Sequence, residues 1–440
     1  MNWRLNSWTT EVWLFIGAFG IRVLYAIVIQ ATSGAHGFIA FSDAEYFYYG
    51  AAKNLLSQHV FSIATHAPYY PDAYHTPLYP LFIAALMFLR FNLFGVVLIQ
   101  DIFATILVLL TYKIAFKLTN SKPIAVFAAV LSIIEPMSIY WSGLLMSDVF
   151  FAVLVCSSFY ALISEKYIPA AIYLGLSALA RPIALLFVPA YILMRIYQGH
   201  LNQKKFNIAL QEIVAMILII AVFVAPWFAR NKIVFNTWQY TSAGWYDLYV
   251  SPITVFATKE NLPLPKIDPG KGNDYDFTRF SFVYSPLYRN ADISVIKEDT
   301  PGYLRFQTIR SVSSLFSDRY EYLIKTVLAA KAPSLFTHIP NLALLFVLSA
   351  GQIFWLCIYL LVLAALLDKK NLHWWLFFAT LVGINAAISG GINPGGSDMS
   401  RYSLPFYPFF FTFAGIGFIQ VRRFFMDFII PGNRTSATKR

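Results

Sequence analysis

Apolar runs of about twenty residues recur along this chain, and they constrain its fold more than any other feature. A helix of that length crosses the roughly 30 Å hydrocarbon core of a bilayer. Charged residues make up only 12% of the 440 residues, about half the share typical of soluble proteins. So few charges cannot cover a water-facing surface. The sequence therefore predicts an all-α, multi-pass transmembrane protein, and it excludes soluble enzymes, nucleic-acid binders and secreted disulfide scaffolds.

Ten spans are predicted when the short apolar stretch 77–90 is placed at the membrane interface. That stretch has about fourteen residues, which is too few to cross comfortably. With it at the interface, the cluster Lys113, Lys117 and Lys122 falls on the cytoplasmic side, as positive residues prefer. Both termini then lie on that side as well. The predicted spans are residues 11–31, 94–117, 122–141, 147–164, 167–180, 182–198, 208–229, 337–366, 372–391 and 403–420.

The predicted spans divide the chain into three parts. These are an N-terminal transmembrane module (1–229) with a first extracytoplasmic loop (32–93), a long extracytoplasmic loop (230–336), and a C-terminal transmembrane module with a short cytoplasmic tail (337–440). The long loop mixes both charge signs and is rich in Pro, Gly and Tyr, so we expect a folded cap or lid.

The first extracytoplasmic loop is expected to contain two interfacial helices. Residues 43–58 carry apolar side chains at a helical period, and 77–90 is the apolar stretch that is too short to span. The only cysteines, Cys156 and Cys357, each lie inside an apolar run. We expect both to be small core residues without a disulfide bond.

Ionisable residues inside predicted spans indicate a functional cavity, because a charge in hydrocarbon is costly. Arg22 lies in mid-span, where an ion pair between its side chain and an acidic residue could hold two helices together. The others fall near the outer membrane face, and they are Asp101, Glu135, Asp148, Arg181 and Arg401. Asp101 and Glu135 have an alternative role as interhelical hydrogen-bond partners, and Arg401 as a headgroup anchor. Arg181 lies in a tight outer hairpin, where a guanidinium group is suited to bidentate binding of phosphate.

The first outer loop carries a second group of reactive side chains. Asp43 begins the expected helix, where a carboxylate either caps free amides or acts as general base toward a hydroxyl. Glu45 and Tyr46 follow, but a helix directs Glu45 roughly opposite to Asp43, which disfavours a shared carboxylate pair. His75 is brought to the same surface by the second half of the loop. A lone interfacial histidine is more often structural than a metal ligand.

Five motifs, in their order along the chain, resemble the membrane glycosyltransferases of superfamily C. The resemblance is to the bacterial branch related to protein O-mannosyltransferases and to the lipid A aminoarabinose transferase. The motifs are Ser-Asp-Ala-Glu-Tyr at 42–46 with Ala-Ala-Lys-Asn-Leu-Leu at 51–56, Pro-Leu-Tyr-Pro at 77–80, Met-Ser-Asp at 146–148, Gly-Leu-Ser-Ala-Leu-Ala-Arg-Pro at 175–182 and Arg-Tyr-Ser-Leu-Pro at 401–405.

The resemblance implies an inverting transferase that moves a sugar from a polyprenyl-phosphate donor to a glycan, lipid or protein acceptor. Such enzymes act at the extracytoplasmic face of the cell (inner) membrane. By this resemblance Asp43 is the expected base, and Arg181 is a candidate ligand of the carrier phosphate. The further residues expected to bind substrate are Arg401, Asp148, Glu45, His75 and Tyr46. Many relatives have adjacent acids where this chain has Asp43-Ala44, so no metal site is carried over, and a divalent cation stays an open alternative.

Two other functional classes remain open. A transporter or flippase of lipid-linked sugars would also need cationic cavity residues, but the inner halves of the predicted spans carry almost no charge. A polymerase or ligase of surface polysaccharide would share the topology and the phosphate-binding arginines. The Asp43 motif and the interfacial helix at 77–90 disfavour this class.

Overall fold

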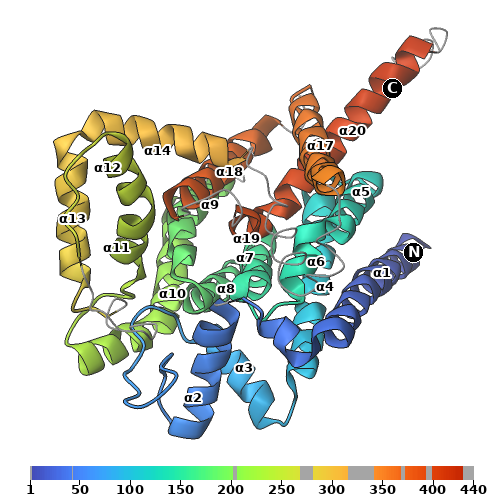
Figure 1. Ribbon diagram of the computed structural model, residues 1–440. Coiled ribbons are helices and arrows are strands. Elements are labelled where there is room, and N and C mark those ends of the chain that lie inside the picture. The colour runs from blue at the N-terminus through green and yellow to red at the C-terminus, as the bar shows by residue number, and fades with distance from the viewer. Residues whose placement is uncertain are drawn as a thin grey trace.

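The computed structural model describes residues 2–41, 43–201, 206–267, 281–315, 341–367, 372–392 and 399–429. These residues form helices connected by loops, and no strand occurs among them (Figure 1). Four of the described helices are long and apolar enough to cross a membrane, and a bent pair makes a fifth. The prediction of a helical membrane protein is confirmed at this level.

A helix lies at each of the ten predicted spans, although how many of them cross the bilayer stays a prediction. Two of these helices, Ser147–Ile163 and Tyr167–Ala180, have only 17 and 14 residues. The helices at the predicted spans are α1 (Asn2–Ser33), α4 (Leu93–Thr119), α5 (Lys122–Ile134) with α6 (Pro136–Ser142), α7 (Ser147–Ile163), α8 (Tyr167–Ala180), η3 (Pro182–Leu186) with α9 (Phe187–Leu201), α10 (Phe206–Phe235), α17 (Asn341–Ala365), α18 (Leu372–Ile392) and α20 (Tyr407–Ile429).

The first loop places short helices at one end of the bundle (Figure 1). After η1 (Gly34–Ile39), the π-helix η2 (Asp43–Tyr49) continues directly into α2 (Gly50–Gln58). The helix predicted for residues 43–58 is thus confirmed. The next helix, α3 (Leu78–Phe88), has 11 residues and is about 16 Å long, roughly half the hydrocarbon thickness. This length agrees with a place at the interface rather than across the membrane.

The chain after α10 forms a small helical unit beside the bundle (Figure 1). Its helices are α11 (Ala243–Leu248), η4 (Tyr249–Ile253), α12 (Thr254–Lys259), α13 (Ser285–Glu298) and α14 (Thr300–Leu315). Ile253, Phe256, Val295 and Tyr303 contribute to a core of its own. We call residues 243–267 and 281–315 the cap. Within the predicted long loop, residues 268–280 and 316–336 lie outside the described residues.

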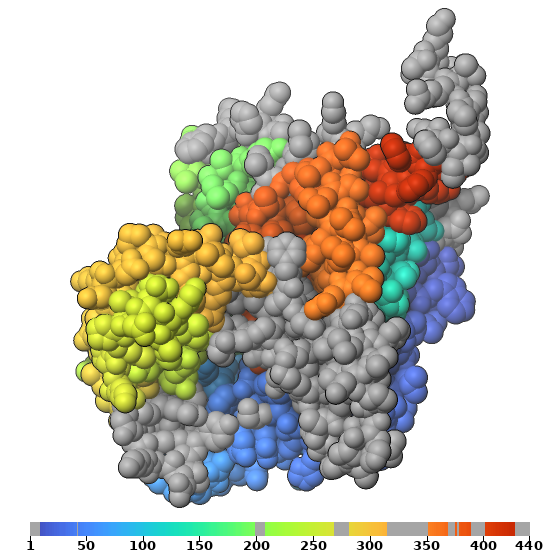
Figure 2. Space-filling model, turned by 45° about the horizontal axis from the view of Figure 1, so that its top comes forward, coloured from blue at the N-terminus to red at the C-terminus, as the bar shows by residue number. Residues whose placement is uncertain are grey.

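The cap is joined to the C-terminal helices as well as to α10. Helix α14 packs along α18, and Figure 2 shows the gold surface of α14 against the orange-red surface of α18. Between α18 and α20 the chain forms α19 (Met399–Ser403) and the short helix η8 (Leu404–Phe406). The cap and α18 therefore meet although they come from different parts of the sequence.

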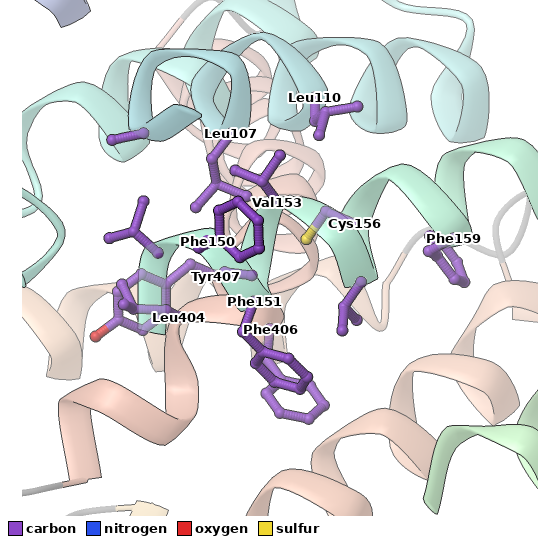
Figure 3. Packing of buried hydrophobic residues seen from close by; sticks show 14 of the residues in the cluster. Leu107, Leu110, Phe150, Phe151, Val153, Cys156, Phe159, Leu404, Phe406 and Tyr407 are labelled. Carbon is purple, nitrogen blue, oxygen red and sulfur yellow. The ribbon is translucent and has the colours of Figure 1, made fainter. Parts of the chain in front are cut away.

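The centre of the bundle is a core in which α4, α7 and the segment 404–407 meet (Figure 3). The Cys156 thiol lies there and donates to the Pro405 carbonyl oxygen at 3.3 Å. Cys357 differs, because it is exposed on α17. The buried side of α17 follows Trp355 and Ile358, and Cys357 falls on the opposite side of the helix. The expectation that both cysteines are core residues is wrong for Cys357.

Candidate functional site

A cavity of about 610 Å³ lies where the bundle, the first loop and the cap meet. Its walls come from η2, the loop segment 74–76, the turn between α8 and η3, α11 of the cap, and residues of α18 and α19. The volume is within the range of about 300–1,000 Å³ that is usual for small-molecule sites. Segments that are distant in sequence therefore build one ligand-sized space.

Two arginines and two aspartates form a linked cluster at this cavity. Arg181 Nη1 donates to Asp148 Oδ1 at 2.5 Å. Arg401 Nε lies 3.3 Å from Asp148 Oδ2, and Arg401 Nη2 lies 3.1 Å from Asp43 Oδ2. Asp148 is fully buried behind the arginines, whereas the Asp43 side chain is 28% exposed. The buried carboxylate thus holds both guanidinium groups in place.

Local sequence explains the position of each member of this cluster. Pro182 disfavours a helical conformation at the residue before it, so α8 ends and Arg181 is extended, with φ −152° and ψ 131°. Asp148 lies in the first turn of α7, where the helix dipole favours a carboxylate. Arg401 belongs to the short helix α19, directly before the last predicted span.

Aromatic rings surround both guanidinium groups. The Arg401 Cζ atom lies 5.3 Å from the ring centroid of Phe41 and 5.4 Å from that of Trp141. The Arg181 Cζ atom lies 5.2 Å from the ring centroid of Tyr402. Such contacts stabilise a cation where water is partly excluded. The rings also restrict the movement of the two arginines, which keeps their positive charge directed at the cavity.

His75 lines the cavity and is held by a neighbouring carboxylate. Asp72 Oδ2 lies 2.9 Å from His75 Nδ1, and the same carboxylate accepts the backbone N–H groups of Tyr74 and His75 at 3.0 and 3.1 Å. Although burial opposes ionisation, the neighbouring His75 and these hydrogen bonds lower the pKa of Asp72 below its ordinary value. An ionised Asp72 fixes the orientation of the imidazole ring.

The cap adds a further acidic group, Asp247, that the sequence did not predict. The Tyr74 hydroxyl donates to Asp247 Oδ1 at 2.6 Å, and both residues line the cavity. Burial raises the pKa of Asp247 to about 7. The only sequence signal is a carboxylate flanked by aromatic residues, in Trp245-Tyr246-Asp247, and nothing in the long loop indicates which face of the protein it meets.

The structure brings five of the seven predicted site residues together. Asp43, Arg181, Arg401 and His75 line the cavity, and Asp148 lies directly behind the arginines. Their chemical roles stay predictions.

Glu45 and Tyr46 do not line the cavity, although both were expected to bind substrate, and Glu45 is exposed. The reason is helical geometry: η2 is a π-helix, and it turns Asp43, Phe47 and Tyr48 toward the cavity at spacings of four and five residues. The positions between them face elsewhere.

The three deeper ionisable residues form a separate cluster outside this cavity. Arg22 donates to the Ala18 carbonyl oxygen at 3.0 Å and lies 3.3 Å from Ser138 Oγ. Glu135 caps α6 by accepting the Ser138 backbone N–H at 2.6 Å, and Asp101 is fully buried within reach of the Arg22 charge. The expected convergence of Asp101 and Glu135 on one outer site is therefore not observed, and both carboxylates instead lie close enough to Arg22 of α1 for their charges to act on it.

No group of three or more His, Cys, Asp or Glu side chains in the described part of the chain is arranged to hold a metal ion. Binding of a divalent cation stays an open alternative. No family model matches the chain, and no curated protein matches it either.

Proposed function

We propose that the chain is an inverting glycosyltransferase that moves a sugar from a polyprenyl-phosphate donor to an acceptor hydroxyl. The observation that supports this most directly is the meeting of Asp43 with Arg181 and Arg401 at one cavity. A carboxylate beside paired guanidinium groups supplies what displacement of a phosphate from a sugar requires: a base for the acceptor and cations for the leaving group.

The arginines are suited to bind the donor phosphate. A guanidinium group presents parallel N–H donors that match phosphate oxygens, and it stays charged at any physiological pH. Asp148 and the surrounding rings hold Arg181 and Arg401 before any donor arrives, so little reorganisation is needed when charge develops on the phosphate. The lipid tail of such a donor would remain in the bilayer while its phosphate reaches the cavity.

Asp43 is the proposed base for the acceptor. The acceptor oxygen attacks the anomeric carbon from the side opposite the phosphate, and its proton passes to the Asp43 carboxylate. The bond between the anomeric carbon and the phosphate oxygen breaks with its electron pair going to the phosphate. A single displacement of this kind inverts the anomeric centre. General base catalysis contributes about 10²–10⁴-fold to such a step.

We further propose that the chain belongs to superfamily C, within the bacterial branch related to protein O-mannosyltransferases and to the lipid A aminoarabinose transferase. We propose the cell (inner) membrane as its location and the extracytoplasmic side for the cavity. The acceptor would be a glycan, a lipid or a protein with an accessible hydroxyl.

Purified protein in lipid, offered a panel of radiolabelled polyprenyl-phosphate sugars, tests the proposal. Asp43→Asn is expected to abolish transfer and to retain donor binding, and Arg181→Ala is expected to weaken binding. Glu260→Gln and Arg289→Ala are the matched controls, because both side chains are exposed on the cap and neither lines the cavity. Both controls should act like the wild type.

Two results would contradict the proposal. Unchanged transfer by Asp43→Asn would remove this residue from the role of base. Absence of turnover with every donor, together with movement of lipid-linked sugars across vesicle membranes, would favour a flippase.

A further inference from the structure

We infer that Tyr74, Trp245 and Asp247 form the subsite for the donor's sugar ring and determine which sugar is accepted. The inference rests on the proposed function and deepens it. It assigns phosphate binding to the helical bundle and sugar selection to the cap, which contributes Trp245 and Asp247 through α11.

The distribution of charge in the cavity supports this division. Among the described residues that line it, Arg181 and Arg401 are the only ones with a permanent positive charge. A donor phosphate therefore binds at their end. The sugar is attached directly to that phosphate, so its hydroxyl groups must meet other parts of the wall. Asp247 is close enough to Arg181 and Asp43 for their charges to influence it, which places it near the reacting centre.

Asp247 has the properties of a hydroxyl-binding group. It is half-buried, Oδ1 accepts from Tyr74, and within the described part of the chain no cation lies at ion-pair distance from it. A partly desolvated carboxylate with so few donors is costly, and burial accordingly raises the pKa of Asp247 to about 7. A sugar hydroxyl that donates to this carboxylate would supply a missing hydrogen bond.

Tyr74 holds this carboxylate in a fixed position. Its ring centroid lies 4.7 Å from that of His75, 6.0 Å from that of Tyr246 and 6.3 Å from that of Phe47. Trp245 lines the same wall two residues before Asp247, where an indole ring can cover the apolar face of a sugar. Aromatic surface beside one fixed acceptor is the composition expected of a sugar subsite.

The Tyr74–Asp247 hydrogen bond is not required to attach the cap. The Ser242 backbone N–H donates to the Ala73 carbonyl oxygen at 2.9 Å, and Arg230 Nη1 donates to the Asp72 carbonyl oxygen at 2.8 Å. These contacts already join the start of the cap and the end of α10 to the first loop. If Asp247 served only to attach the cap to the first loop, its desolvation would cost free energy although other hydrogen bonds already make that attachment.

Binding measurements with two kinds of ligand test the inference. One is polyprenyl phosphate without a sugar, and the other is a set of polyprenyl-phosphate sugars that differ in a single hydroxyl group. Asp247→Asn is expected to bind the sugar-free carrier as well as the wild type does. It should bind the preferred sugar donor about 10–100-fold more weakly, as expected for loss of a hydrogen bond to a charged group, and should discriminate less among the sugars.

Tyr74→Phe is the second variant, because it removes one hydroxyl and preserves the ring packing. It should show the same pattern with a smaller loss. Arg181→Ala should weaken binding of both ligands, with or without the sugar. Unchanged affinity and unchanged sugar ranking in Asp247→Asn, with normal carrier binding, would overturn the inference and leave the proposed function standing. Failure of the wild type to bind the sugar-free carrier would refute the proposed function, and the inference with it.

Discussion

Because Asp43 pairs with Arg401, the proposed base and the phosphate of the proposed donor would compete for the same guanidinium group. Removing the carboxylate charge should therefore favour the phosphate. We predict that Asp43→Asn binds polyprenyl phosphate about fivefold more tightly than the wild type, which corresponds to about 1 kcal/mol for a partly exposed pair. Equilibrium binding to protein in lipid nanodiscs measures this. Weaker binding by the variant would mean that Asp43 contacts the donor favourably instead of competing with it.

The sequence identified the residues of the arginine–aspartate cluster better than those of the proposed sugar subsite. Arg181 was recognisable because it lies in a tight hairpin between two predicted spans, and Arg401 because it precedes an apolar run. Asp247 was missed because its partner, Tyr74, lies 173 positions away and no local pattern connects them. Contacts of this kind depend on how the cap folds back over the first loop.

At the scale of single elements, the packing of α20 against α17 depends on one glycine. A Cβ atom at Gly417 of α20 would overlap the backbone of Leu361 in α17. Backbone cannot move aside as a flexible side chain does, so Gly417→Ala should destabilise the protein by about 1–3 kcal/mol. Gly383→Ala in α18 is the control, since a Cβ atom there would meet nothing within 4 Å. Thermal unfolding in detergent measures both variants, and equal melting temperatures would contradict this prediction.

Hydropathy predicted where helices lie but not how they bend. Residues 122–141 were predicted as one span, whereas α5 and α6 meet at an angle of 56°. The cause is local: Pro136 lacks a backbone N–H, and Glu135 accepts the Ser138 N–H to begin a new helix. A hydropathy window averages over such a break because its flanks are equally apolar.

At the scale of the whole molecule, a buried carboxyl in the cap makes stability depend on pH. Asp292 is fully buried, and burial raises its pKa from 3.8 to about 8. The folded protein therefore binds this proton more tightly than the unfolded chain does. Its contribution to stability is complete below about pH 4 and is lost as the pH rises toward 8. The raised pKa of Asp247 gives a contribution to stability of the same sign, which is lost as the pH rises toward 7.

Asp292→Asn should remove the Asp292 contribution to this dependence and leave that of Asp247. We predict that the melting temperature of the wild type falls between pH 5 and pH 8, and that the variant falls less and melts higher at pH 8. Glu260→Gln, an exposed carboxyl on the same cap, should follow the wild type. An equally steep decline in Asp292→Asn would show that other groups govern the effect.

The Asp43–Arg401 contact also has a consequence for biosynthesis. The two residues are separated by 358 positions, so almost the whole chain must leave the ribosome before they can meet. Until α19 is in place, Asp148 has only Arg181 as its cationic partner in this cluster, and the cavity lacks one wall. A nascent chain that has inserted only its early helices has no complete site. Under the proposed function, donor lipids in the surrounding membrane would thereby be protected from unproductive cleavage during synthesis, and a chain truncated before α19 should be inert.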